Sequence, residues 1–288
     1  MMRYVRLIGL FVCFFFIVTV DLQAQKPGKL KVMSFNIRMN YQDDGVNNWG
    51  FRKSYLTDVI KKHKPDLLGI QEAYFPQFVD LKNLMVEYDA FGPVDGRQGA
   101  ESVGVLYLKT KMCLIDSGTF WLSQTPAIQS LGWDANLRRT VTWGKFEIKD
   151  SGRKLFFFTT HFDFKGKQAP GESTKLLLKK VKEIAGQEIA VVTGDFNFRE
   201  TSKHYKMLTE GLGDGYRFFD SYHLANEKIG PTWSLNSFGK TAEIKRGKID
   251  FIFSNHRYRV SKYENIAEHK GDFYPSDHNP QVATYYFK

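Results

Sequence analysis

Five short polar clusters adjoin apolar runs, and together they contain the side chains best suited to catalysis. They are residues 34–36, 71–72, 160–163, 194–197 and 276–279. Because loops at strand ends commonly meet in one pocket, we expect these clusters to converge. Their carboxylates and amides are the oxygen ligands that a hard divalent cation prefers, and two clusters also carry a histidine. The combination predicts metal-assisted hydrolysis of a phosphoester.

The first two clusters supply Asn36 and Glu72 as candidate cation ligands. Each residue also has a structural interpretation. An asparagine at a strand end often bonds its own backbone in a turn. Glu72 stands where it would cap a helix that starts near Pro76. Neither residue decides the question alone.

Alternating polar residues follow two further apolar runs. Asp195 and Asn197 are separated by one phenylalanine, as are His161 and Asp163. Residues i and i+2 of an extended chain point to the same side, so each pair is expected to share a face. Asp195 would orient an attacking water and Asn197 would donate to phosphate oxygens. An Asx-turn explains the same pair without catalysis.

The last cluster places Asp277 and His278 just before a strand-like terminal run. The pair offers a cation or water ligand beside a phosphate donor or base. Asp250, which opens another run, is expected to fix the tautomer of His278 and raise its basicity. A turn explains the neighbours of His278, but it does not explain the histidine.

The elements that must position these residues alternate between strands and helices. Strand-like runs occupy residues 30–35, 66–70, 103–108, 141–148, 154–160, 188–193, 249–253 and 281–287, and helical periodicity covers 52–63 and 172–185. Several strand-like runs are apolar throughout, which indicates sheets covered on both faces. We therefore predict a mixed α/β domain with helices outside.

Residues 1–24 predict a signal peptide. Arg3 and Arg6 precede an apolar run that ends at Val20, and Ala24 is a small residue at the expected cleavage point. An uncleaved anchor is the alternative, although the run is shorter than the roughly 20 residues of a spanning helix. Cleavage would give a periplasmic or secreted protein with no stable membrane anchor. Residues 25–288 would then form a single domain, which we expect to be monomeric.

The cysteine count and the net charge limit the kinds of metal site and substrate that the protein could have. Of the two cysteines, Cys13 lies in the predicted signal peptide, so Cys113 alone would remain. This excludes an intrachain disulfide and a cysteine-based zinc site in the processed chain. The formal net charge of +10 favours phosphorylated or polyanionic substrates. A basic surface without such a role fits equally, and the scattered basic residues form no nucleic-acid track.

Taken in order, the clusters resemble the endonuclease/exonuclease/phosphatase superfamily. This group includes DNase I-like nucleases, inositol-phosphate 5-phosphatases, neutral sphingomyelinases and mRNA deadenylases. The resemblance runs from Leu30 to about Tyr286, and residues 116–123 and 132–135 are similar to exported bacterial members. It implies the α/β fold of DNase I, a four-layer α-β-β-α sandwich.

The resemblance also implies a divalent cation and the residues around it. The cation would be Mg²⁺ or Mn²⁺, bound by Glu72 with help from Asn36, while Asp277 would complete the metal and water shell. Asp195 would orient or deprotonate the water, and Asn197 would hold the phosphate.

Histidines and a further acid complete the implied site. His278, paired with Asp250, would contact the scissile phosphate, and His161 would stabilise charge on its oxygens. Glu101 falls where relatives keep an acid in the pocket. Phe164 departs from related exported proteins, which often have a second histidine there, and this affects the pocket rim rather than the core chemistry.

The leading hypothesis is an exported, metal-dependent phosphodiesterase that cleaves a P–O bond by in-line attack of water at the metal site. The alternatives are a phosphomonoesterase acting on sugar or inositol phosphates and a silent module that binds polyanions. The substrate stays open between nucleic acid, a phospholipid headgroup and a phosphosugar. Asp163 and Trp121 are candidate substrate contacts, and Arg138 or Arg139 would bind phosphate. Core packing and a solvated charged pair explain the tryptophan and arginines equally well.

Overall fold

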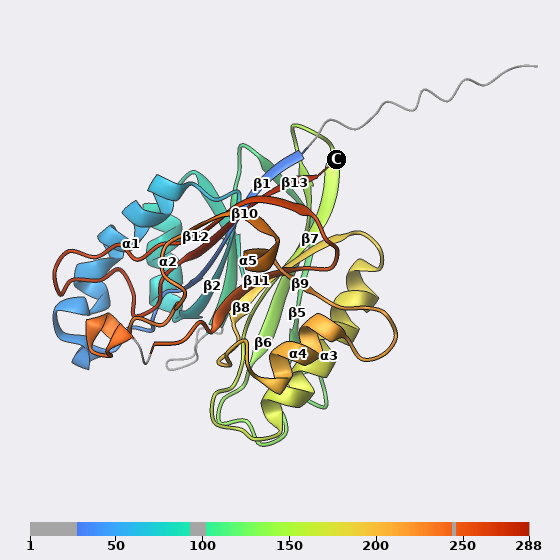
Figure 1. Cartoon of the computed structure of the whole chain (residues 1–288). Coiled ribbons are helices and arrows are strands. Elements are labelled where there is room, and N and C mark those ends of the chain that lie inside the picture. Colours follow the sequence, from blue (N-terminus) through green and yellow to red (C-terminus); the bar gives the residue numbers. More distant parts are fainter. Residues whose placement is uncertain (1–27, 93–101, 244–245, 288) are drawn as a thin grey trace, which may run out of the picture.

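The chain folds into two β-sheets packed face to face, with helices on both outer sides (Figure 1). This is a computed structural model, and it describes residues 28–92, 102–243 and 246–287. The seven-stranded sheet has the order β10-β12-β13-β1-β2-β4-β3, and the six-stranded sheet has the order β5-β6-β7-β8-β11-β9. The architecture is the four-layer α/β sandwich that the sequence predicts.

The seven-stranded sheet carries two helices on its outer face. Its strands are β1 (Gly28–Asn36), β2 (Leu67–Ala73), β3 (Tyr88–Phe91), β4 (Ser102–Leu108), β10 (Ala225–Ile229), β12 (Arg259–Asn265) and β13 (Gln281–Phe287). The helices are α1 (Trp49–His63) and α2 (Phe75–Leu84), which bury an apolar core against β1, β2 and β4. The Asn48 side chain accepts a hydrogen bond from Gly50 N and caps α1.

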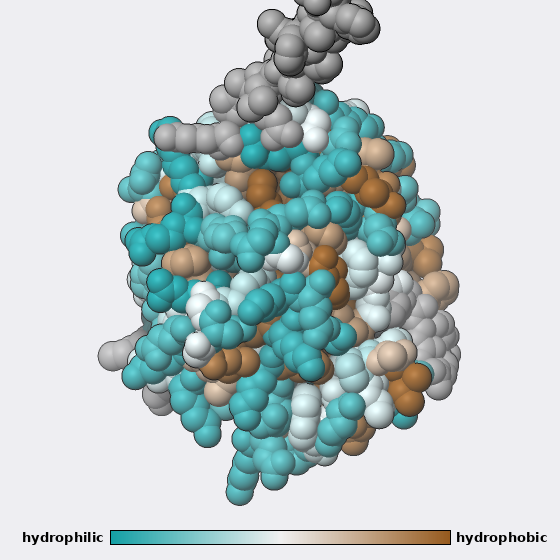
Figure 2. Space-filling view, turned by 90° about the vertical axis from the view of Figure 1, so that its right-hand side faces the viewer, coloured by the Kyte–Doolittle hydropathy of each residue, from teal (hydrophilic) through white to brown (hydrophobic). Residues whose placement is uncertain are grey.

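The six-stranded sheet is covered in the same way on its opposite side. Its strands are β5 (Met112–Trp121), β6 (Thr140–Ile148), β7 (Arg153–His161), β8 (Ile189–Asp195), β9 (Phe219–Asp220) and β11 (Asp250–Ser254). Helices α3 (Ala169–Ala185) and α4 (Lys203–Glu210) cover this sheet, while α5 (Ser221–Leu224), η1 (Gln42–Asn47) and η2 (Ser237–Gly239) are short. The face over α3 and α4 is mostly hydrophilic, with apolar residues scattered over it (Figure 2).

A third apolar core fills the space between the sheets, and one glycine sets their closest approach. Strands β1, β2, β7, β8 and β11 all contribute side chains to this core. A Cβ atom on Gly69 would lie 2.4 Å from the hydroxyl oxygens of Thr159 and Thr193 in the facing sheet. Gly69 therefore lets the sheets meet just before the end of β2.

The sequence predicts the central strands better than the edge strands. All eight predicted strands form, and both predicted helices begin three residues earlier than their apolar periodicity indicates. Five strands were not predicted: β3, β5, β9, β10 and β12. β5 and β10 lie at sheet edges and expose many side chains, so their sequences lack the continuous apolar runs of buried strands.

The pairing brings the polar clusters to one end of the sandwich. β1 and β2 are parallel, so Asn36 pairs with Gln71, and β7 and β8 are parallel, so His161 pairs with Asp195. The antiparallel partners β13 and β11 begin where β1 and β8 end, and Asp250 pairs with Asp195. The fold thus delivers the clusters to a common edge.

The predicted signal peptide lies outside the described residues, so its cleavage stays a prediction. Within the described part of the chain, no helix combines the length and apolarity needed to cross a membrane.

Candidate active site

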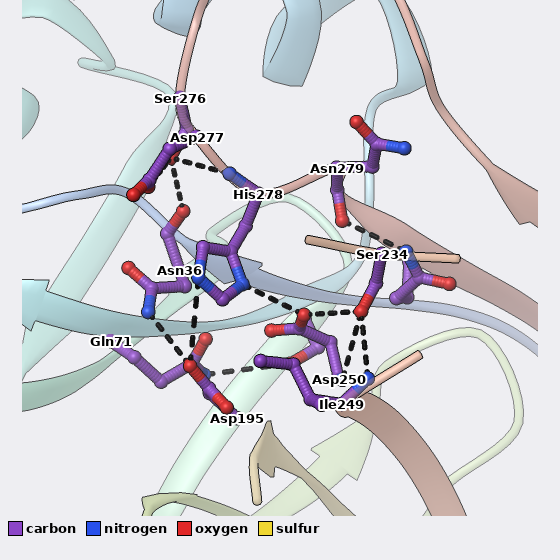
Figure 3. Close-up of polar contacts among 12 residues, drawn as sticks. Asn36, Gln71, Asp195, Ser234, Ile249, Asp250, Ser276, Asp277, His278 and Asn279 are labelled. Carbon is purple, nitrogen blue, oxygen red and sulfur yellow. Dashed lines mark hydrogen bonds and ion pairs between the residues drawn. The ribbon is translucent and has the colours of Figure 1, made fainter. Parts of the chain in front are cut away.

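A hydrogen-bonded chain of side chains crosses from one sheet to the other at this common edge (Figure 3). The amide Nδ2 of Asn36 donates to Glu72 Oε1 at 3.1 Å and to Asp195 Oδ2 at 3.0 Å. His278 Nε2 lies 3.8 Å from the same Asp195 oxygen. Residues from β1, β2, β8 and the loop before β13 therefore lie in one cluster, as the sequence predicts.

Local backbone geometry turns Glu72 toward this cluster. The pairing of β2 with β4 is irregular between Ile70 and Ala73, and Glu72 has a positive φ of 62°. Left-handed backbone is unfavourable for a residue with a side chain and is often found at functional sites. Glu72 Oε2 accepts from Met39 N at 3.0 Å, whereas Tyr74 is the N-cap of α2. Glu72 therefore does not cap that helix.

His278 is held in a charged state by two aspartates. Its Nδ1 lies 2.8 Å from Asp250 Oδ2, which also accepts a hydrogen bond from Ser234 Oγ at 2.6 Å. Burial alone would lower the pKa of His278, but the negative charges of Asp250 and Asp195 outweigh it and raise that pKa well above its ordinary value. Nδ1 donates to Asp250, so Nε2–H points toward Asp195.

Asp195 is the carboxylate at the centre of the cluster. Its Oδ1 accepts from Asn197 N at 2.9 Å, which is the predicted Asx-turn, and its Oδ2 faces Asn36 and His278. Burial and the neighbouring charge of Asp250 raise the pKa of Asp195 to about 7. A carboxylate with that pKa is suited to accept a proton near neutral pH.

His161 lies on the other side of Asp195 and is held neutral. Arg139 Nη1 is 2.8 Å from His161 Nδ1. A guanidinium can only donate, so Nδ1 accepts and the ring proton lies on Nε2, which is 3.5 Å from Asp195 Oδ2. Burial and the charge of Arg139 lower the pKa of His161 well below its ordinary value. Asn197 Nδ2 lies 3.0 Å from Nε2 and donates to Phe162 O, and Asn197 has a left-handed φ of 54°.

An acidic patch beside Glu72 has the chemistry of a cation site. Burial raises the pKa of Asp277, and the negative charge of Glu72 raises it further. Two carboxylates that repel each other are stabilised by a shared cation. Arg38 supplies part of the positive charge that balances these carboxylates. It forms an ion pair with Asp44 at 3.1 Å and lies 3.8 Å from Asp277. The carboxylate oxygens of Glu72 and Asp277 fit Mg²⁺ or Mn²⁺, whereas Asn36 turns Nδ2 toward Glu72 and its Oδ1 accepts from Arg38 N at 3.0 Å.

In the part of the chain that the structure describes, two other groups of acids and a histidine could hold a metal ion. Asp195, Asp250 and His278 place one ligand atom each within 4.8 Å of one another. They already bond one another, and His278 uses Nδ1 for Asp250, so we interpret them as a proton-handling group. Glu200, Asp220 and His223 form the second group, and there Lys248 Nζ lies 2.9 and 3.2 Å from the two carboxylates. The lysine ammonium takes the place of a cation.

Arg52 positions the loops of the site, a role that no sequence motif indicates. The side chain is fully buried and donates to the backbone oxygens of Asn47, Ile37, Arg38 and Pro275 at 2.7–3.0 Å. It thereby ties the chain after Asn36 to the chain before the 276–279 cluster. Its place in the polar part of a helix pattern looks like an ordinary exposed arginine, so only the structure reveals the role.

Asp163, a predicted substrate contact, is buried and bonded to the backbone of the surrounding loops. Asp163 is 2% exposed, and its carboxylate accepts from the backbone amides of Asn136, Leu137, Lys165 and Gly166 at 2.7–3.3 Å. It does not share the face of His161, because the chain leaves the strand after residue 161, and the geometry favours loop anchoring over substrate contact.

The two arginines and Trp121 differ in burial, because Arg139 is 4% exposed and contacts His161. Arg138 is exposed, and with Arg139 and His161 it lines a small cavity of about 10 Å³. Trp121 ends β5, is partly buried and is bonded through its backbone to Pro126 O. Glu101 lies outside the described residues.

Comparison with known proteins gives consistent matches. The family described as "Endonuclease/Exonuclease/phosphatase family" matches residues 33–278. A protein of that description from Bacteroides vulgatus has a solved structure with a TM-score of 0.85. It is 36% identical, and the match covers 91% of this chain and all of that one.

Two further matches have names that describe an activity. The structure of a mannosyl-6-phosphatase from Bacteroides thetaiotaomicron VPI-5482 is 31% identical with a TM-score of 0.81, covering 90% of this chain and 100% of that one. Tyrosyl-DNA phosphodiesterase 2 of Danio rerio is 26% identical over 180 residues, which are 61% of this chain and 43% of that protein.

Proposed function

We propose that this chain, which belongs to the endonuclease/exonuclease/phosphatase family, is a divalent-metal-dependent phosphoesterase whose preferred substrates are sugar phosphate monoesters. The observation that carries the proposal is the convergence of Glu72, Asn36, Asp195 and His278 through contacts of 3.0–3.8 Å. These four residues come from elements as much as 242 positions apart in the chain.

Glu72 and Asp277 would hold the cation, and Asn36 would position Glu72 by donating to its Oε1. A bound Mg²⁺ or Mn²⁺ would neutralise charge on the phosphate oxygens and make a coordinated water more acidic. The remaining residues divide the work of proton transfer and charge stabilisation. Asp195, with its pKa of about 7, orients the attacking water and takes its proton.

The two histidines serve the phosphate in different ways. His278, positively charged and fixed by Asp250, donates from Nε2 to a phosphate or leaving-group oxygen. His161 Nε2–H and the second hydrogen of Asn197 Nδ2, whose first hydrogen goes to Phe162 O, would both donate to an anionic oxygen of the bound phosphate. Both donors are fixed before substrate arrives, so little reorganisation is required.

The choice of monoester over diester comes from the relatives. The leading hypothesis from the sequence is a phosphodiesterase, but the 31%-identical structure named a mannosyl-6-phosphatase supports a phosphosugar monoester. The 26%-identical tyrosyl-DNA phosphodiesterase supports a diester as the second candidate. Export to the periplasm or beyond is part of the proposal and is supported by the sequence of residues 1–24.

Hydrolysis assays on two substrates test the proposal. Purified protein is incubated with mannose 6-phosphate or bis(p-nitrophenyl) phosphate, in Mg²⁺, Mn²⁺ or EDTA, with His278→Gln as the matched inactive control. We expect EDTA-sensitive release of phosphate from the monoester at a higher kcat/KM than cleavage of the diester. A preference for the diester would support the second candidate, and no turnover of either would contradict the enzymatic assignment.

A further inference from the structure

A cavity of about 200 Å³ lies beside the 276–279 cluster, and the proposed chemistry does not use it. Its walls come from the loop after β10 and the loop after β12. Among the described residues that line it are Pro231, Trp233, Arg246, His269, Tyr274 and Asn279. Both loops lie at the end of the sandwich that carries the candidate active site, because β11 and β13 begin there.

The cavity and the catalytic cluster share one short ribbon of backbone. Leu235 and His278 form an antiparallel bridge, and Asn279 N donates to Ser234 O at 2.7 Å. Ser234 and His278 direct their side chains to Asp250, as Figure 3 shows. Trp233, which precedes Ser234, and Asn279, which follows His278, line the cavity. The cavity is therefore one residue away from Ser234 and His278 in each segment.

The lining combines flat rings with hydrogen-bonding groups. The Arg246 guanidinium lies 4.3 Å from the centre of the Trp233 ring, and the His269 and Tyr274 rings stack at 4.5 Å with an interplanar angle of 12°. Asn279 is 4% exposed, and its Oδ1 accepts from Asn236 Nδ2 at 2.9 Å. These contacts fix the side chains in advance. Pockets for drug-sized ligands measure roughly 300–1,000 Å³, so this cavity suits a single ring.

The segment that supports this wall has an unusual backbone. Ser237 and Phe238 are consecutive non-glycine residues with φ of 53°, and Gly239 follows with φ of 75°. The Asn236 side chain holds the turn by accepting from Phe238 N at 2.7 Å, while Asn236 N and Ser237 N donate to Asp277 O. Strain of this kind persists where the surroundings over-determine the conformation, commonly at ligand sites.

We propose that this cavity is a subsite for the ring of a phosphosugar, with its phosphate in the candidate active site. The inference rests on the proposed function and names the part of the molecule that would recognise the leaving group. Aromatic rings such as Trp233 and Tyr274 provide flat apolar faces for a pyranose. Arg246 and Asn279 provide polar groups for its hydroxyls.

Steady-state kinetics with two monoesters tests the subsite. Mannose 6-phosphate has a ring, whereas glycerol 3-phosphate has none. Changes in the cavity should therefore affect the kinetics of mannose 6-phosphate only. We expect Trp233→Ala to raise KM for mannose 6-phosphate about tenfold, because stacking on the ring is lost. Neither kcat for that substrate nor kcat/KM for glycerol 3-phosphate should change. Trp233→Phe keeps a flat ring and should retain most of the affinity.

Tyr286 supplies the matched control. It is also an aromatic residue beside an arginine, with Arg259 5.5 Å from its ring, but it lies near the opposite end of β13. Tyr286→Ala should leave both substrates unaffected. Equal losses on both substrates in Trp233→Ala would contradict the subsite and indicate a structural role, and unchanged kinetics on both would contradict it outright.

A binding measurement separates the subsite from the proposed function. The chain has five tryptophans, so labelling with 5-fluorotryptophan gives five ¹⁹F resonances, and Trp233→Phe identifies one of them. Titration with methyl α-mannoside, which has no phosphate, should shift the Trp233 resonance without turnover. A shift with no phosphatase activity would retain the subsite and reject the proposed function. Activity with no shift and no change in KM would reject the subsite alone.

Discussion

The two histidine corners of the site are equally buried but carry opposite charge states. His161 and His278 are each 5% exposed, and each lies within 3.8 Å of Asp195. His278 faces Asp250 and is held protonated, whereas His161 faces Arg139 and is held neutral. Desolvation is therefore not what distinguishes them. The charge of the side chain bonded to Nδ1, Asp250 or Arg139, decides which histidine acts as a cation and which as a neutral donor.

The loops that carry the two corners are anchored by opposite chemistry. Arg52 holds the His278 corner by donating to backbone oxygens, including that of Pro275. Asp163 holds the His161 corner by accepting from backbone amides, including that of Asn136. In both cases one buried charge satisfies several backbone groups that have left regular structure. A single charged side chain thus fixes each of these two loops.

The largest expected effect comes from removing the protonated histidine. His278→Gln should lower kcat by about 10³-fold, because both a charged donor and an acid–base group are lost. His161→Gln keeps a neutral N–H donor and should lower kcat much less. Phosphate release under saturating substrate measures both. Equal losses in the two variants would contradict the division of roles, and unchanged thermal unfolding would exclude misfolding as the cause.

Loss of the arginine anchor should affect stability more than any change at the rim. Arg52→Met leaves several buried carbonyls without donors, and we expect a loss of at least about 3 kcal/mol in the free energy of unfolding. Asp163→Asn keeps the size of the side chain and one acceptor oxygen. Its loss in the free energy of unfolding should be smaller, about 1–2 kcal/mol. Urea unfolding at neutral pH measures both. A small loss in Arg52→Met would mean that water replaces its contacts.

Removing the guanidinium from the His161 corner should release the fixed tautomer. Arg139→Gln should lower kcat by about 10- to 100-fold with little change in KM, as expected for a residue that orients another. Arg139→Lys keeps a donor and should recover part of the loss. ¹⁵N chemical shifts of His161 report the tautomer directly. If the proton stays on Nε2 in Arg139→Gln, Arg139 does not set it.

The smallest effect expected is a difference in how the two histidines change stability with pH. The pKa of His278 is raised on folding, so its stabilising contribution is present below the unfolded value of about 6.5 and is lost as pH rises through the folded value. The pKa of His161 is lowered, so stability is lost as pH falls below about 6.5. Urea unfolding from pH 5 to 9 should show a reduced alkaline loss in His278→Gln and a reduced acidic loss in His161→Gln. The same pH profile in both variants would contradict the comparison.

The sequence predicted the strand-end residues because their signal is local. Asn36, Glu72, Asp195 and His278 stand where apolar runs stop or begin. The parallel pairs β1–β2 and β7–β8, together with the antiparallel partner β13, bring them to one edge. The same runs predict a mixed α/β domain, whereas the four-layer sandwich was implied by the family resemblance. The supporting residues have no such signal.

What the sequence missed depends on tertiary contacts. Arg52 appears as a polar helical residue until the fold places four backbone oxygens around it. Ser234 gains its role only when β11 places Asp250 beside it. Asp163 was expected to share the face of His161, but the backbone leaves the strand between them. The edge strands β5 and β10 have too few buried positions to show an apolar pattern.

A Mg²⁺ titration of wild-type protein and Glu72→Gln tests the central claim most directly. After EDTA treatment and dialysis, hydrolysis of mannose 6-phosphate should be absent and should return on addition of Mg²⁺. Glu72→Gln should require at least about 10- to 100-fold more Mg²⁺ for half-maximal rate while unfolding like the wild type. A full rate in EDTA, or the same Mg²⁺ dependence in both proteins, would contradict a cation site built on Glu72.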